Sequence, residues 1–147
     1  RHIEKLHKLF NEEMILYSTA SHADISNKKI LVIDNVGLLS SLYAYGEIAY
    51  IGGGFEDGIH NTLEPAVFGL PVLFGPRYKK FVEAVALADK GFATPIRNAT
   101  EANEKLKELI SDPGTLEKMH RAIRDFIQNH TGATTKVMTY IRDKSLL

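Results

Sequence analysis

Short apolar runs alternate with stretches of helical apolar spacing along most of the chain, and this alternation restricts the fold more than any other feature. Strand-like runs occupy residues 14–18, 30–33, 47–51, 71–74 and 91–96. The run at 30–33 is continuous and rich in β-branched residues, which is typical of a strand covered on both faces. Repeated strand–helix units predict an α/β fold, a Rossmann-like parallel sheet with helices on both faces.

Amphipathic helices are predicted on either side of these strands. Ile3, Leu6 and Phe10 share one face of a helix at the start of the chain. Further helices are expected over residues 36–43, 63–68 and 81–88. From Thr100 onward the sequence is charged and helical, with a break at Pro113 and a closing helix in residues 132–147. No repeat or linker divides the chain, so we expect one domain over residues 1–147.

Composition excludes several classes of function. The 147 residues include 18 Lys and Arg against 18 Asp and Glu, so no bulk charge attracts nucleic acid or an anionic membrane surface. The absence of cysteine excludes disulfides and thiolate chemistry. No apolar run approaches the ~20 residues of a membrane span, and the first residues do not have the layout expected of a signal peptide. We expect a soluble chain, which lacks an initiator Met and is interpreted as part of a longer protein.

A glycine-rich loop follows the strand 47–51 and precedes the helix near Thr62. In a parallel sheet this loop lies at the carboxyl edge, where ligands bind. Amides of Gly53 and Gly54 can approach an anion closely, and the helix N-terminus adds partial positive charge, so a phosphate fits. The pattern is neither G-x-G-x-x-G nor a P-loop. The alternative interpretation is that the glycines only turn the chain.

Three polar residues, His60, Asn61 and Glu64, surround the predicted helix start. The spacing N-x-x-E is also that of a capping box, in which Glu64 would bind the backbone of Asn61. With Asn61 as N-cap, however, Pro65 would forfeit the first intrahelical hydrogen bond. We therefore expect a helix that begins about a residue later, with the Glu64 carboxylate free to bind a diol such as a ribose.

Other strand ends offer further candidates at the same edge. Asp34, Asn35 and Gly37 follow the strand 30–33. Three cations follow the strand 71–74 in the segment "GPRYKKF", namely Arg77, Lys79 and Lys80. A solvated loop is the simpler interpretation of these three cations, and the sequence assigns them no role.

Together these residues resemble the C-terminal, donor-binding half of GT-B glycosyltransferases, and most closely the 3-deoxy-D-manno-octulosonic acid (Kdo) transferases. "RH" at the first two residues is similar to the end of that family's "PRH" motif. "DNVGLLSSLYAYGEIAYIGGG" resembles its "DTMGEL…LYA…ADVAFVGG" stretch, and "HNTLEPAVFGLPVLFGP" resembles its "HNPLEPA..GKPVLFGP" block, which is the most specific match.

The resemblance implies a binding site for the nucleotide of CMP-Kdo. Arg1 would contact the phosphate or nucleotide, and Val36, Gly37 and Leu38 would line the pocket. Asn61 would lie near the phosphate, Glu64 would hold the ribose hydroxyls, and His60 would support the phosphate or the loop. Where the family has Met-Gly-Glu, this chain has Val-Gly-Leu at residues 36–38, so a carboxylate is lost there.

The resemblance also implies an activity for the longer protein. It would transfer Kdo from CMP-Kdo to the lipid A precursor at the cytoplasmic face of the bacterial inner membrane, without a metal or other cofactor. The family's catalytic base lies in an N-terminal domain, through which the acceptor would bind, so this fragment alone is expected to be inactive. The alternatives are a GT-B enzyme that uses a UDP-sugar, or a non-catalytic nucleotide-binding module.

Overall fold

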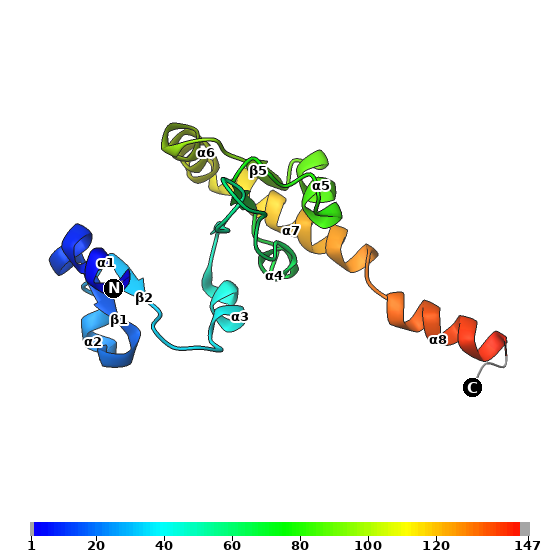
Figure 1. The fold of residues 1–147 in the computed structure, drawn as a ribbon, viewed down its shortest axis with the longest axis horizontal. Coiled ribbons are helices and arrows are strands. Elements are labelled where there is room, and N and C mark those ends of the chain that lie inside the picture. The colour runs from blue at the N-terminus through cyan, green and yellow to red at the C-terminus, as the bar shows by residue number, and fades with distance from the viewer. Residues whose placement is uncertain (1, 145–147) are drawn as a thin grey trace. The chain divides into compact units, whose positions relative to one another are not determined.

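The structure is a computed structural model that describes residues 2–144, without the side chains of His22 and Ala23. The chain forms two compact units, Arg1–Leu42 and Tyr43–Leu147 (Figure 1). Each unit has its own parallel strands and helices. The α/β fold class is therefore confirmed, whereas the single domain over residues 1–147 stays a prediction.

The first unit contains a two-stranded parallel sheet. Its elements are α1 (His2–Phe10), η1 (Asn11–Glu13), β1 (Met14–Leu16), η2 (Tyr17–Thr19), α2 (His22–Ile25), β2 (Ile30–Val32) and α3 (Leu39–Leu42). Strands β1 and β2 pair from Met14 opposite Ile30 to Leu16 opposite Val32. The short helix α2 was not expected, and it forms because Ser21 and Asp24 make a capping box.

Strand β2 is less buried than its sequence predicted. The continuous apolar run suggested cover on both faces, but Leu31 is 37 % exposed and its two neighbours in the strand are only half-buried. Within its own unit β2 is thus only partly covered, and the doubly covered strand stays a prediction. In the part of the chain that the structure describes, β2 pairs with β1 alone and is not the centre of a larger sheet.

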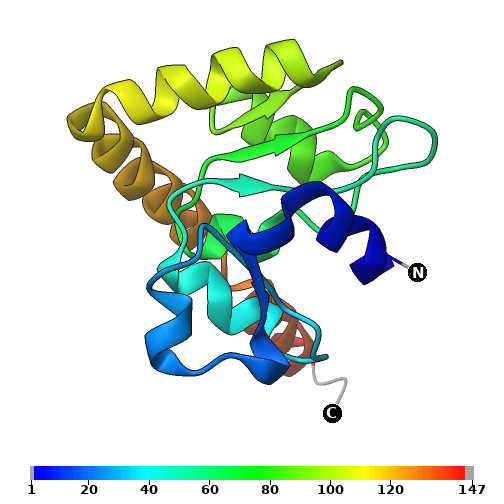
Figure 2. The same ribbon diagram turned by 90° about the vertical axis from the view of Figure 1, so that its left-hand side faces the viewer.

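The second unit contains a three-stranded parallel sheet in the order β3-β4-β5 (Figure 2). Its elements are η3 (Tyr43–Tyr45), β3 (Ala49–Tyr50), α4 (Leu63–Val67), β4 (Val72–Phe74), α5 (Val82–Asp89), β5 (Ala93–Pro95), α6 (Ala99–Ser111), α7 (Pro113–Asn129) and α8 (Ala133–Asp143). Strands that the sequence assigned to one sheet thus form two sheets within residues 2–144.

The central strand β4 forms the middle of the core, with helices packed on both of its faces. Val72 and Phe74 point into one apolar cluster together with Leu87 of α5 and Ile123 of α7. Leu73, which points to the opposite face, lies in a second cluster that includes residues of α6 and α7. All three β4 side chains are at most 1 % exposed, so each contributes about 1.5–3 kcal/mol of apolar burial.

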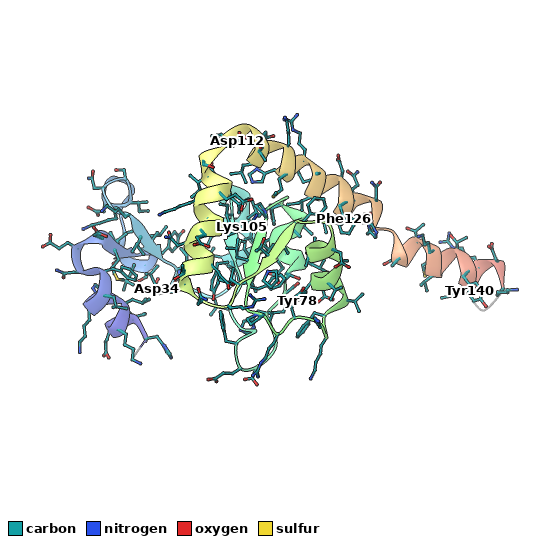
Figure 3. All side chains as sticks on the ribbon, turned by 90° about the horizontal axis from the view of Figure 1, so that it is seen from above. Asp34, Tyr78, Lys105, Asp112, Phe126 and Tyr140 are labelled. Atoms are coloured by element: carbon teal, nitrogen blue, oxygen red, sulfur yellow. The ribbon has the colours of Figure 1, made fainter. Side chains whose placement is uncertain are left out.

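The break between α6 and α7 lies where proline predicted it. Asp112 is the N-cap of α7, Pro113 is the first helical residue, and the Asp112 carboxylate accepts hydrogen bonds from the backbone of Gly114 and Thr115. Figure 3 shows Asp112 at the turn between the two helices. Proline tolerates the first helical position because its missing N–H would have no partner there.

Candidate functional site

The loop between β3 and α4 is closed on itself by its own backbone. Gly53 pairs with Ile59 in an antiparallel bridge, and the Gly54 N–H donates to the carbonyls of Asp57 (3.1 Å) and Gly58 (3.2 Å). Gly53 and Gly54 have φ angles of 89° and 81°, in the left-handed region that favours glycine. The Gly54 amide, predicted to face an anion, is thus used to shape the loop.

A second strand-end loop, residues 75–81, packs directly on the first. The Gly75 N–H donates to the Gly53 carbonyl (3.3 Å), and the Arg77 N–H donates to the Gly54 carbonyl (2.8 Å). A Cβ atom on Gly58 would lie 2.5 Å from the ring of Phe81, so glycine is needed for this contact. Both loops follow the carboxyl ends of parallel strands, at the ligand edge (Figure 2).

Helix α4 begins beside a pair of linked polar side chains. Asn61 Oδ1 accepts a hydrogen bond from the backbone N–H of Leu63 (3.0 Å), and Asn61 Nδ2 donates to Glu64 Oε1 (2.9 Å). Glu64 therefore binds the side chain of Asn61 and not its backbone, so the capping box does not form. Within residues 2–144, Glu64 Oε2 has no protein partner, and both side chains are exposed.

The start of α4 agrees with the position of its proline. The N-cap is Thr62, one residue later than in the capping-box alternative, so Pro65 is the third helical residue and forfeits no intrahelical bond. Glu64 lies in the first turn, as predicted. The exposed side chain of His60 lies two residues before the N-cap, and its backbone N–H donates to the Gly52 carbonyl (3.2 Å).

The end of α4 is held against α7, which fixes the short helix in place. Gly69 N–H donates to Ala66 (2.9 Å) and Leu70 N–H donates to Pro65 (3.1 Å), the two bonds of a Schellman motif. Gly69 has a φ of 83°, and a Cβ there would lie 2.7 Å from the His120 carbonyl of α7. Glycine therefore both ends α4 and lets the two helices approach.

Two residues beneath the polar pair were missed by sequence reasoning. Thr62 is fully buried, and its Oγ1 has no hydrogen-bond partner among the residues that the structure describes. Tyr43 packs on Phe68 with ring centroids 6.2 Å apart. Burial raises the pKa of the Tyr43 phenol, and the nearby Glu64 carboxylate raises it further. The sequence did not indicate that Tyr43 lies near Glu64, because Tyr43 simply fits the apolar spacing of a helix.

A pocket of about 560 Å³ lies between the two strand-end loops. Its basic residues are Arg77, Lys79 and Lys80 from the loop after β4. Carboxylates line it from the tip of the glycine loop, at Glu56 and Asp57. The pocket thus gathers the three cations to which the sequence assigned no role.

The remaining predicted residues belong to the first unit or lie outside the description. Val36 is fully exposed, Leu38 is half-buried, and Gly37 has a φ of 96° with open space where a Cβ would be. Asp34 accepts hydrogen bonds from the side chain and backbone of Ser18, and these bonds lower its pKa. Arg1 lies outside the described residues.

Within the described residues, no His, Asp and Glu side chains gather in a group of three or more that could hold a metal ion. Helices in this same range are too short or too polar to cross a membrane.

The fold is similar to that of a solved structure. This is the crystal structure of the C-terminal CMP-Kdo binding domain of WaaA from Acinetobacter baumannii, with a TM-score of 0.72 and 23 % sequence identity. The match covers 86 % of this chain and 67 % of the other. The chain therefore has the expected α/β fold of the C-terminal half of a GT-B glycosyltransferase.

Sequence comparison then relates the chain to 3-deoxy-D-manno-octulosonic acid transferases, which confirms the family resemblance. It is 37 % identical to the Aquifex aeolicus transferase over 115 residues, and 32 % identical to that of Chlamydia trachomatis serovar D over 129 residues. A probable mitochondrial transferase of Arabidopsis thaliana is 30 % identical over 130 residues.

These alignments cover 76 %, 83 % and 84 % of this chain but only 32 %, 29 % and 29 % of the three relatives. The chain thus spans about a third of the length of the curated relatives that it matches. No family model matches it.

Proposed function

We propose that this chain is the donor-binding part of a Kdo transferase and that it binds CMP-Kdo at the start of α4. The observation that carries the proposal is the Asn61–Glu64 pair at the ligand edge of the parallel sheet, with one oxygen of Glu64 unpartnered in the described range. The relatives are named as transferases of this sugar, and the structural neighbour is named as a CMP-Kdo binding domain.

Glu64 is the group that holds the ribose in this proposal. A carboxylate accepts hydrogen bonds only, and a ribose presents two neighbouring hydroxyl donors. Because Asn61 Nδ2 restrains one carboxylate oxygen, the side chain is held in position before the ligand arrives. The other oxygen remains available for a hydroxyl.

The phosphate would lie near Asn61 and His60 in the same proposal. Negative charge develops on the departing cytidylate when the sugar bond breaks, and donors fixed in position stabilise it. In the second unit, His60 and the Gly53 amide are the candidate donors, because the Gly54 amide is engaged inside its loop. The roles of Arg1, Val36, Gly37 and Leu38 stay predictions from the resemblance. We propose that no metal takes part.

Transfer needs an acceptor and a catalytic base. We place the base, and the site that binds the acceptor, in the rest of the full-length protein. The acceptor would be the lipid A precursor, at the cytoplasmic face of the inner membrane. Incubated with CMP-Kdo and lipid A precursor, this 147-residue chain should release no product above a protein-free blank. Product formation would overturn the assignment of the base to another domain.

Nucleotide preference tests the donor assignment. The amide spectrum of the chain, recorded during titration with CMP, should show shifts at His60, Asn61 and Glu64, and UDP at the same concentration should shift them less. Stronger shifts with UDP would support a GT-B enzyme that uses a UDP-sugar, as in peptidoglycan synthesis. Shifts confined to other residues with both nucleotides would contradict the proposed site.

A further inference from the structure

The pocket between the two strand-end loops contains charged groups that the proposed nucleotide site does not use. Its three cations come from the segment after β4 and its two carboxylates from the tip of the glycine loop. Counted over these five side chains, the lining carries one net positive charge. A pocket of about 560 Å³ lies within the size range of small-molecule sites.

Arg77 is held at this pocket by two hydrogen bonds to the glycine loop. Its backbone N–H donates to the Gly54 carbonyl (2.8 Å), and its Nη1 donates to the Glu56 carbonyl (2.7 Å). The other guanidinium N–H groups have no partner in the part of the chain that the structure describes, so they remain available for an anion. A guanidinium fixed at one nitrogen loses less freedom when it binds a carboxylate.

The two lysines add positive charge that is not paired with a carboxylate in the described part of the chain. Lys79 and Lys80 make no ion pair within residues 2–144, although Glu56 and Asp57 line the same pocket. Tyr78, which follows Arg77 in the sequence, packs its ring on Phe74 with centroids 5.1 Å apart. This contact ties the basic loop to the buried central strand and so holds the cations at the sheet edge.

The mixture of groups discriminates between kinds of anion. A bare phosphate gains from the three cations but is repelled by the two carboxylates. A polyhydroxylated acid can use both, because its carboxylate pairs with the cations while its hydroxyls donate to Glu56 and Asp57. Phe81 and Pro76 supply apolar surface for the carbon skeleton.

We propose that this pocket binds the sugar part of the donor, with Arg77 and Lys80 on the carboxylate of the eight-carbon sugar acid. The inference rests on the proposed function and adds a second subsite to it: the nucleotide is held at the start of α4 and the acid between the loops. Arg77, Lys79 and Lys80 thereby become residues that determine which sugar is accepted.

The test separates this subsite from the nucleotide site by its probes. Free 3-deoxy-D-manno-octulosonic acid and its methyl ester are titrated into the 147-residue chain while the backbone amides are observed. The free acid should shift the amides of residues 76–81 and 56–58, and the ester should bind about tenfold more weakly because it lacks the charge. Equal binding of acid and ester, or acid-induced shifts only elsewhere, would overturn the proposal.

Variants make the assignment residue-specific. Arg77→Gln and Lys80→Gln should each weaken binding of the free acid by about tenfold or less, and should leave binding of CMP unchanged. Lys90→Gln, at an exposed lysine that follows α5, is the charge-matched control and should change neither. A loss of CMP binding in the two pocket variants would show that the pocket serves the nucleotide.

The two proposals fail in different ways. If CMP does not bind but the free acid shifts the pocket amides, the nucleotide site is wrong and the acid subsite stands. If inorganic phosphate binds the pocket as tightly as the acid, the pocket is a phosphate site, and the acid subsite is overturned. A lipid-linked phosphate would then be the next ligand to test.

Discussion

The backbones of Gly54 and Gly75 are in direct contact, in the loops that follow strands β3 and β4. A Cβ atom built on Gly54 would lie 2.8 Å from the Gly75 carbonyl oxygen, and one built on Gly75 would lie 2.6 Å from the Gly54 carbonyl carbon. Neither position has room for a side chain. The two loops that form the candidate site are therefore positioned by direct contact of their main chains.

Gly54→Ala should destabilise the second unit by more than the cost of placing alanine at a left-handed φ. A left-handed φ costs about 1–2 kcal/mol for alanine, and crowding against Gly75 adds about 1–3 kcal/mol. Gly91→Ala is the matched control, because Gly91 has a φ of 74° but open space around its Cβ position. Chemical denaturation should rank the two variants in this order, and equal losses would argue against the backbone contact.

Thr62→Val should leave stability unchanged or raise it by up to about 1 kcal/mol, because it removes a buried hydroxyl that has no partner in the described residues. The control is Thr115→Val, which removes a hydroxyl that donates to Asp112 at 2.6 Å and should be destabilising. Denaturation midpoints measure both effects. A clear loss of stability in Thr62→Val would mean that the hydroxyl is hydrogen-bonded.

Glu64→Gln should lower the pKa of Tyr43. Burial is the larger cause of the raised phenol pKa and is untouched by this change, so only the part due to the carboxylate disappears. The titration can be followed by NMR with labelled tyrosine. Glu83→Gln, which removes a carboxylate from α5, serves as the control and should not move it. An unchanged Tyr43 titration in Glu64→Gln would contradict the proximity of these residues.

Asp112 should stabilise α7 in a pH-dependent way. A hydrogen bond from the Thr115 hydroxyl, with further bonds from backbone N–H groups, lowers the Asp112 pKa below its ordinary value of about 3.9. A lowered folded-state pKa means that the contribution is complete above that ordinary value and is lost as the pH falls through the folded-state pKa.

The stability difference between the wild type and Asp112→Asn should therefore be largest near neutral pH and shrink below about pH 4. Thermal unfolding at several pH values measures it. At pH 7, Asp125→Asn on the exposed face of α7 should leave the midpoint nearly unchanged. A difference for Asp112→Asn that stays constant with pH would mean that its charge contributes nothing.

The sequence predicted the order of helices and strands because apolar periodicity reports burial directly. It also placed the start of α4 correctly, since the position of Pro65 excludes a helix that begins one residue earlier. The sequence also predicted the polar residues Asn61 and Glu64 at that start, from residue type and spacing. It did not predict the hydrogen bond between them, because side-chain contacts depend on rotamers that a pattern does not specify.

What the sequence could not predict depends on contacts between distant segments. Gly54 was expected to face an anion, but its amide is used by Asp57 and Gly58 within the loop. The pocket that contains Arg77 also arises from contacts between segments that are far apart in the sequence. Local periodicity carries no information on such contacts.

The most direct measurement of the central claim is a cycle of binding constants, with CMP and its 2′,3′-dideoxy analogue each titrated into wild type and Glu64→Ala. If Glu64 holds the ribose hydroxyls, the substitution should weaken CMP by about tenfold and leave the analogue's affinity unchanged. An equal loss for both ligands, or no loss for either, would contradict a nucleotide held through its ribose at the start of α4.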